Sequence, residues 1–230
     1  MTSPGDSWKV AVGQHETTAI WEPPLDAGGA SDPLSAPCFV CAHGAGGHLS
    51  DRLTLAATRA LREIGLSTVR FNFLYRERKS SRPDPMPQLI ACLDAVIERV
   101  QRERNPPRLI LGGRSMGGRA ASMLLAGRTV ANGLLLLAYP LHPPGQPAKL
   151  RADHLAAIQV PVLCFNGTRD PFCDPPLMNK IVAALGANWR MHWLDGADHS
   201  FHVLKSSGRS DSDVLAEVAA ETSRWIATVV

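Results

Sequence analysis

The chain has 230 residues, of which 45% are apolar and 20% are charged, and its net charge is +3. This length and composition suit one globular domain with a large core, so we expect a single domain over residues 1–230, with residues 1–7 disordered. The small charge argues against nucleic-acid and membrane partners, because both need Lys and Arg clustered on one face. No targeting segment is expected, and the longest apolar run, Leu134–Leu141, is too short to span a bilayer.

Five cysteines, an odd number, are scattered through core-like segments. This usage predicts reduced thiols and a cytoplasmic protein. Cys38 and Cys41 form a C-x-x-C pair, a spacing known from metal and redox sites. They fall in a strand-like run, where residues three apart point to opposite faces, so we expect two small buried hydrophobes and no metal site.

Apolar runs and amphipathic stretches alternate along the chain, separated by turns rich in Pro and Gly. The apolar runs predict strands over Trp8–Val12, Thr17–Trp21, Cys38–His43, Leu66–Phe73, Leu109–Gly112, Leu134–Ala138, Val160–Asn166 and Trp189–Leu194. The amphipathic stretches predict helices over Asp51–Ile64, Pro87–Arg104, Met116–Ala126, Pro176–Leu185 and Asp213–Ala227. This alternation indicates an α/β fold, a mainly parallel sheet with helices on both faces, whose reactive groups gather at the carboxyl ends of the strands.

Local signals mark some of the connections between these elements. The stretch from Pro23 to Pro37 is expected to be a loop. Ser50 is expected to cap the first helix, and Gly65 is expected to end it.

Ser115 lies in the sequence Gly113-Arg114-Ser115-Met116-Gly117, a G-x-S-x-G between a predicted strand and a predicted helix. This context predicts a nucleophile elbow, in which a strained turn presents the serine. Gly113 and Gly117 would clear space around the turn, and Gly118 would let the helix approach the sheet. The alternatives are a glycine-rich turn without chemistry and a phosphate cradle.

Two backbone N–H groups are candidates for an oxyanion hole. The turn places the N–H of Met116 at a helix N-terminus, where negative charge is favoured. The segment His43–Gly47, after the first buried strand, offers the N–H of Ala45, with Gly44 and Gly46 beside it to contact substrate. His43 precedes the nucleophile in the chain, so we expect it to orient this loop and not to act as a base.

An acid and a base follow Ser115 in the chain order Ser, Asp, His, which is the order used by enzymes with a nucleophile elbow. Asp170 comes at the end of a predicted strand, with Asp174 as its rival and a plain turn role before a proline as the alternative. His199 follows the last predicted strand, with His192 and His202 as competitors. The expected catalytic set is therefore Ser115, Asp170 and His199, with His199 accepting the serine proton and Asp170 fixing the imidazole tautomer. This chemistry needs no metal or organic cofactor.

Four segments carry a resemblance to a known family: Gly112–Arg119, Tyr139–Pro147, Asn166–Phe172 and Gly196–Phe201. From about His43 onward the chain resembles α/β-hydrolases. It is most similar to the small hydrolases related to testis-expressed protein thirty and to the hydrolase-like domain of a subunit of the NSL histone acetyltransferase complex. Dienelactone hydrolases and acyl-protein thioesterases resemble the chain more distantly. The dienelactone hydrolases use a cysteine nucleophile, whereas this chain has Ser115.

The resemblance implies an α/β-hydrolase fold with a minimal lid or none. Larger relatives insert a lid domain where this chain has only Tyr139 to Gln159, so we expect an open cleft lined by Tyr139, His142 and Arg114. Further basic residues are expected at the same edge, namely Arg76, Arg78, Lys79, Arg82, Arg119 and Arg169. They either select a carboxylate- or phosphate-bearing acyl substrate or are solvated and structurally paired.

The favoured function is a serine hydrolase that cleaves a small carboxylic ester or thioester through an acyl-enzyme on Ser115. The expected partner is a small acyl substrate, and the chain is expected to be a monomer or homodimer. A non-catalytic scaffold or interaction domain, as the NSL-complex resemblance permits, is the main alternative. A serine peptidase is a third reading, disfavoured because the chain has no propeller or cap to select peptides.

Overall fold

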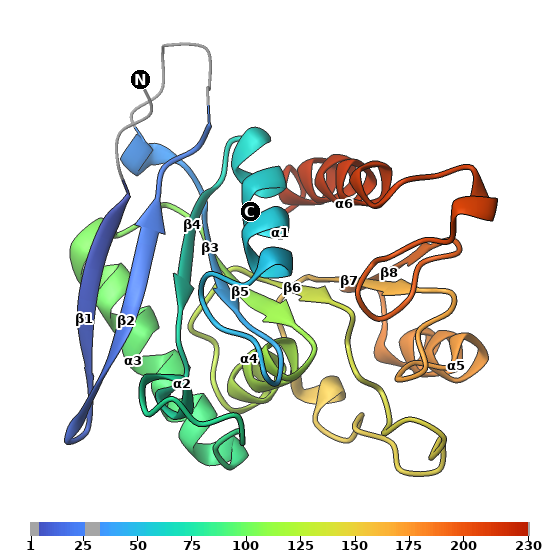
Figure 1. The fold of residues 1–230 in the computed structure, drawn as a ribbon, viewed down its shortest axis with the longest axis horizontal. Coiled ribbons are helices and arrows are strands. Elements are labelled where there is room, and N and C mark those ends of the chain that lie inside the picture. The colour runs from blue at the N-terminus through green and yellow to red at the C-terminus, as the bar shows by residue number, and fades with distance from the viewer. Residues whose placement is uncertain (1–4, 26–32, 230) are drawn as a thin grey trace.

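Eight strands form one sheet in the computed structural model, which describes residues 5–25 and 33–229 (Figure 1). The strands are β1 (Asp6–Val12), β2 (His15–Glu22), β3 (Cys38–Ala42), β4 (Ser67–Phe71), β5 (Leu109–Arg114), β6 (Gly133–Leu137), β7 (Val162–Gly167) and β8 (Trp189–Leu194). They lie in the order β1-β2-β4-β3-β5-β6-β7-β8. The pairs β1–β2 and β2–β4 are antiparallel. The other neighbouring pairs, β4–β3, β3–β5, β5–β6, β6–β7 and β7–β8, are parallel. The predicted α/β class and the mainly parallel sheet are confirmed.

Helices cover both faces of the sheet, as predicted. They are α1 (Arg52–Glu63), α2 (Leu74–Glu77), α3 (Met86–Arg104), α4 (Met116–Gly127), α5 (Pro175–Leu185) and α6 (Asp211–Ile226), with short 3-10 turns η1 (Pro33–Ser35), η2 (Leu155–Ala157) and η3 (Lys205–Ser207). α1 and α6 pack on one face, and α3, α4 and α5 pack on the other (Figure 1). Only η2 interrupts the segment from β6 to β7, so no lid domain follows β6.

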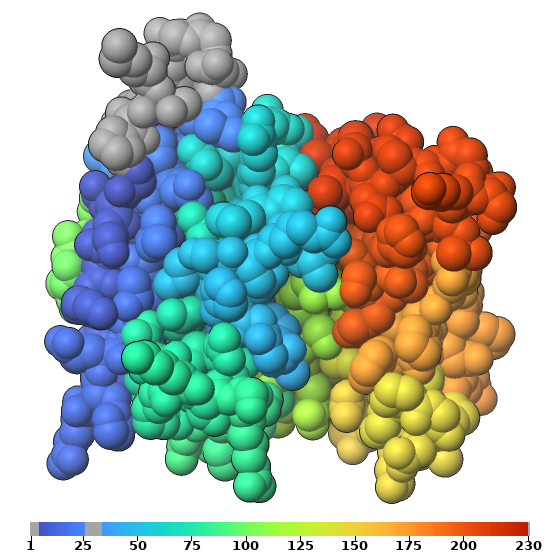
Figure 2. All heavy atoms as spheres, viewed as in Figure 1, coloured from blue at the N-terminus to red at the C-terminus, as the bar shows by residue number. Residues whose placement is uncertain are grey.

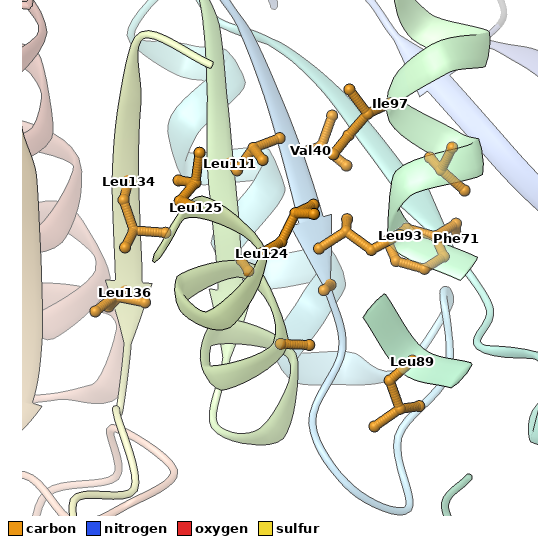
Figure 3. Close-up of a cluster of buried hydrophobic side chains, with 14 of the residues drawn as sticks. Val40, Phe71, Leu89, Leu93, Ile97, Leu111, Leu124, Leu125, Leu134 and Leu136 are labelled. Atoms are coloured by element: carbon orange, nitrogen blue, oxygen red, sulfur yellow. The ribbon is translucent and has the colours of Figure 1, made fainter. Parts of the chain in front are cut away.

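The larger part of the core lies between the sheet and the helices α3 and α4 (Figure 3). Its members include Val40, Phe71, Leu89, Leu93, Ile97, Leu111, Leu124, Leu125, Leu134 and Leu136. Each such side chain stabilises the fold by roughly 1.5–3 kcal/mol when it is fully buried. Because both faces are covered, the central strands are buried along their whole length and mostly apolar, and the open positions of the sheet are at the strand ends.

Three local expectations are corrected by the structure. Asp6 and Ser7 belong to β1, where they pair with Trp21 and Ile20, so they are ordered; residues 1–4 lie outside the described part. The N-cap of α1 is Asp51 and not Ser50, because the Asp51 carboxylate accepts from the N–H groups at 53 and 54. The short helix α2 was not predicted. Of the expected loop at 23–37, residues 26–32 lie outside the described part.

The five cysteines are all free and buried. Cys38 belongs to the core on the α3 and α4 side, and Cys41 belongs to the core on the α1 and α6 side, so the two side chains point to opposite faces as predicted. Burial raises the pKa of both thiols to about 12. Within residues 5–25 and 33–229, no group of three or more His, Cys, Asp or Glu is placed to hold a metal ion. No described helix is long and apolar enough to cross a membrane.

Candidate active site

Ser115 occupies a strained turn between β5 and α4. Its backbone φ of 49° and ψ of −115° lie in a region that side-chain-bearing residues rarely adopt. A Cβ on Gly113 would lie 2.1 Å from the carbonyl oxygen of Ala42, and one on Gly117 would lie 2.3 Å from the same atom. A Cβ on Gly118 would lie 2.7 Å from the oxygen of Gly113, in the adjoining strand. The three glycines therefore let the turn and the first turn of α4 pass close to β3 and β5, as the elbow prediction requires.

We expect Gly117→Ala to destabilise the protein by more than about 2 kcal/mol, because its new methyl group would overlap backbone atoms of Ala42 and His43 that cannot move aside. Gly127→Ala is the matched control in the same helix, since nothing lies within 4 Å of its Cβ position. The control should be neutral or stabilising by up to about 1 kcal/mol. Urea denaturation of both variants measures the difference, and equal stabilities would contradict the close-approach argument.

His199 links Ser115 to Asp170 through its two ring nitrogens. The imidazole Nε2 lies 2.9 Å from Ser115 Oγ, and Nδ1 lies 2.8 Å from Asp170 Oδ2. Because the carboxylate can only accept, Nδ1 carries the proton, and the lone pair on Nε2 is left to accept from the serine hydroxyl. The loops after β5, β7 and β8 thus bring together the three residues that the sequence singled out.

Asp170 is held from two sides at the end of β7. Its side chain is fully buried, its Oδ2 accepts from Asn166 Nδ2 at 3.1 Å, and its Oδ1 accepts from the N–H of Phe172 at 2.8 Å. Asn166 is itself fixed, since its Oδ1 accepts from the N–H of Tyr139. These bonds fix the carboxylate with one oxygen facing His199.

The rival residues are engaged elsewhere. Asp174 caps α5 by accepting from the N–H of residue 177. His192 bonds Glu217 at 2.7 Å, and His202 bonds Asp211 at 3.0 Å. None of these three side chains belongs to the hydrogen-bonded chain from Ser115, which contains His199 and Asp170.

Two contacts to His199 were not predicted. The ring of Phe172 packs against the imidazole, with centroids 4.3 Å apart. Arg114 reaches across from the elbow, and its Nη2 donates to the carbonyl oxygen of His199 at 2.6 Å. Burial lowers the pKa of this guanidinium, and the charges of Asp51, Asp170 and Asp198 partly offset the effect. Arg114 was expected to contact substrate, but this bond gives it a role in holding the loop that carries His199.

The loop after β3 faces the elbow from the other side. A Cβ on Gly44 would lie 3.6 Å from Ser115 Cβ, Ala45 is exposed, and Gly46 has a φ of 75°. The backbone N–H groups of Ala45 and Met116 make no hydrogen bond to any described residue. In Figure 2, yellow-green atoms are visible between the light blue loop after β3 and the red loop after β8. Ser115 is partly exposed, so the site is open to solvent.

His43 lies beneath this loop, as predicted. Its Nδ1 is 2.8 Å from the carbonyl oxygen of Gly44, and its Nε2 accepts from the N–H of Phe73 at 3.1 Å. The residue is fully buried, and burial lowers the pKa of the imidazole to about 4. His43 is therefore neutral near pH 7 and ties β3 to the segment after β4.

The His43 pKa predicts a pH dependence of stability. In the unfolded chain this imidazole titrates near 6.5, so between pH 6.5 and 4 the unfolded state binds one more proton than the folded state. Above pH 6.5 the neutral His43 has no effect on the pH dependence of the free energy of unfolding. Below pH 6.5 this free energy falls as the pH drops, by roughly 3 kcal/mol at pH 4. Urea denaturation between pH 4.5 and 7.5 should show this loss for the native chain and not for His43→Gln. Parallel pH profiles for the two proteins would contradict it.

Tyr139 and His142 do not line the cleft, and the prediction that they do is wrong. Tyr139 has no exposed surface, and its hydroxyl donates to the carbonyl oxygen of Arg151 at 2.6 Å. His142 is 5% exposed, with Nδ1 2.9 Å from the carbonyl oxygen of Pro143 and Nε2 accepting from the N–H of Asp174. Both side chains fold inward to hold the segments that follow β6 and β7.

Several of the basic residues at this edge are paired within the chain. Arg76 donates to the carbonyl oxygen of Ser80, Arg169 donates to that of Gly196, and Arg78 forms an ion pair with Asp84. These three arginines are therefore structurally paired, which is the second of the two expectations for the basic residues. The Arg119 side chain differs, because it makes no hydrogen bond or ion pair with a described residue and its Nε is buried without a partner.

Comparison with known proteins gives the family and the fold. A family model described as an alpha/beta hydrolase domain matches residues 35–227, and the chain belongs to that family. Among solved structures, it is similar to XC6422 from Xanthomonas campestris, described as an a/b serine hydrolase without lid, with a TM-score of 0.77, 23% identity, and coverage of 98% of this chain and 96% of that one.

Two further solved structures share the fold. An alpha-beta serine hydrolase homologue from Coxiella burnetii gives a TM-score of 0.73 at 20% identity, with 97% of each chain covered. The dienelactone hydrolase from Anabaena variabilis gives 0.71 at 18% identity, with 98% of each chain covered. The α/β-hydrolase fold predicted from the sequence is thereby confirmed, and family membership supports a hydrolase.

Proposed function

We propose that this protein is a serine hydrolase that cleaves a small carboxylic ester or thioester through an acyl-enzyme on Ser115. The observation that carries the proposal is the hydrogen-bonded chain from Ser115 Oγ through His199 to the buried carboxylate of Asp170, with distances of 2.9 and 2.8 Å. Nucleophile, base and orienting acid stand in hydrogen-bond reach of one another, as nucleophilic catalysis requires.

In the proposed reaction, the hydroxyl proton of Ser115 passes to His199 Nε2 as Oγ attacks the acyl carbonyl. The N–H groups of Met116 and Ala45 would stabilise the resulting oxyanion, by about 3–4 kcal/mol for each well-placed donor. His199 then returns the proton to the leaving alcohol or thiol, and the acyl group remains on Oγ. Water, deprotonated by His199, attacks the acyl-enzyme, and release of the carboxylic acid restores the serine.

Labelling with a fluorophosphonate tests the nucleophile directly. We expect stoichiometric labelling of the native chain and none of Ser115→Ala, because the probe reacts with an activated serine hydroxyl. A folded native protein that takes up no label would favour the non-catalytic alternative.

A substrate panel tests the acyl and leaving groups. p-Nitrophenyl esters with acyl chains of increasing length, and the corresponding acyl-CoA thioesters, should separate ester from thioester specificity. The open site and the absence of a lid domain after β6 support small substrates, so we expect kcat/KM to be highest for short acyl chains. Preference for long chains would contradict this part of the proposal.

A further inference from the structure

A small pocket lies next to the candidate active site, between the first turns of α1 and α6. Its volume is about 70 Å³, which corresponds to roughly five water-sized positions. Most of its wall is apolar, formed by Leu53, Ala56, Ala57, Leu137, Phe201 and Leu215. The remaining lining residues are Arg52, Arg114, Ser200 and Asp211.

The pocket adjoins the reacting groups without containing them. Arg114 directly precedes Ser115, and Ser200 directly follows His199, but neither Ser115 nor His199 lines the pocket. Because neither reacting group belongs to the lining, a ligand in this pocket contacts Arg114 and Ser200 and not the serine oxygen. The pocket is therefore distinct from the place where the acyl carbonyl would be attacked.

Both guanidinium groups of the pocket are free of ion pairs. Arg52 makes no hydrogen bond or ion pair with any described residue, and Arg114 makes only its bond to the carbonyl oxygen of His199. The one carboxylate in the lining, that of Asp211, is taken by His202 and by the N–H of Val203. Asp211 acts on Arg52 from a longer distance, but neither guanidinium forms an ion pair with a described residue. Two such cations beside apolar walls favour a ligand that is anionic at one end and apolar at the other.

The carboxylates that stabilise the charge of Arg114 from a longer distance are also occupied. Asp51 caps α1, Asp198 accepts from the N–H groups of Ser200 and His202, and Asp170 bonds His199. None of them lies within ion-pair distance of Arg114. An incoming anion would thus meet a guanidinium whose donors are not already committed to a carboxylate.

We propose that this pocket binds a small carboxylate with a short apolar tail, of the class of a short-chain fatty acid. The carboxylate binds Arg114 and Arg52, and the tail packs against Leu53, Phe201 and Leu215. The volume limits the buried part of the tail to a few carbon atoms.

Occupancy of the pocket has a consequence that rests on the proposed function. If a carboxylate on Arg114 draws its Nη2 away from the carbonyl oxygen of His199, it loosens the loop that positions the imidazole. Ester hydrolysis releases a carboxylic acid of this same chemical class. Short-chain acids should therefore lower kcat and leave KM unchanged, because they act on the base and not on substrate binding.

Calorimetry with butyrate and the full-length Ser115→Ala chain tests the site without any turnover. We expect butyrate to bind, and both butyramide, which lacks the charge, and inorganic phosphate, which lacks the tail, to bind at least about tenfold more weakly. Arg114→Met should weaken butyrate binding by a similar factor. Arg59→Met is the matched control on α1, where Arg59 is exposed and paired with Glu63, and it should bind within about twofold of its parent.

Ala56→Phe fills the pocket without removing a charge, and it decides the test if Arg114→Met fails to fold. It should abolish butyrate binding. Three results would contradict the proposed site. They are butyrate binding that Ala56→Phe does not change, butyramide binding as tight as that of butyrate, and a Kd for butyrate weaker than about 10 mM. Binding with no effect on kcat of the native enzyme would overturn the inhibition alone. Absence of hydrolase activity would overturn the proposed function and leave the binding result standing.

Discussion

Ser115→Ala is expected to lower kcat for ester hydrolysis by about 10⁵-fold or more while leaving the fold intact. The Ser115 hydroxyl bonds the Nε2 of His199 and makes no capping bond to α4, so its loss removes the nucleophile and little else. The free energy of unfolding should change by less than about 1 kcal/mol, the net contribution of one hydrogen bond. Steady-state kinetics with a p-nitrophenyl ester and urea denaturation of the same preparation measure both quantities.

Ser122→Ala provides a matched control within α4. Ser122 also bonds a histidine, with its Oγ 2.8 Å from His154 Nε2, but it is fully buried and lies outside the chain that runs to Asp170. We expect this variant to keep kcat within about threefold and to lose about 1 kcal/mol of stability. Equal losses of kcat in the two variants, or substantial turnover by Ser115→Ala, would contradict the assignment of the nucleophile.

Asp170→Asn is expected to lower kcat by about 10⁴-fold in a chain that still folds. With the amide oxygen accepting from the N–H of Phe172 at the Oδ1 position, the amide nitrogen faces His199, and the Nδ2 of Asn166 loses its acceptor there. The imidazole must then accept at Nδ1 and carry its proton on Nε2, where it can no longer take the proton of Ser115. Steady-state kinetics compare the variant with the native chain.

Asp174→Asn tests the alternative acid under matched conditions. Asp174 caps α5, and asparagine is an equally good cap, so we expect kcat within about twofold of the native value and little change in stability. A large loss of kcat from Asp174→Asn, together with an active Asp170→Asn, would reverse the assignment of the acid.

The sheet and the elbow could be predicted because each depends on local sequence. Buried parallel strands are apolar along their whole length, as in Cys38–Ala42, and are recognised without knowing their neighbours. The elbow needs glycine at Gly113 and Gly117, since any Cβ there would overlap Ala42, and this leaves a visible motif around Ser115. The expected chain order Ser, Asp, His then limits the candidates for the acid and the base to residues that follow Ser115.

The supporting contacts could not be predicted, because they join segments far apart in the chain. No local pattern shows that Phe172 stacks on His199 or that Arg114 holds its carbonyl oxygen. Polar aromatic residues after a strand look suited to a cleft, yet Tyr139 turns inward, where its hydroxyl finds the carbonyl oxygen of Arg151. Ser50 and Asp51 are both good caps by residue type, and only the geometry of the loop after β3 selects Asp51.

The most direct measurement of the central claim is the mass of the protein quenched in acid during turnover of p-nitrophenyl acetate. We predict an acetyl group on the peptide that contains Ser115, with an initial burst of one p-nitrophenol for each acetyl group transferred to the enzyme. Ser115→Ala should carry none. Turnover with the acetyl group on another residue, or a folded native protein that is neither acylated nor active, would contradict the account.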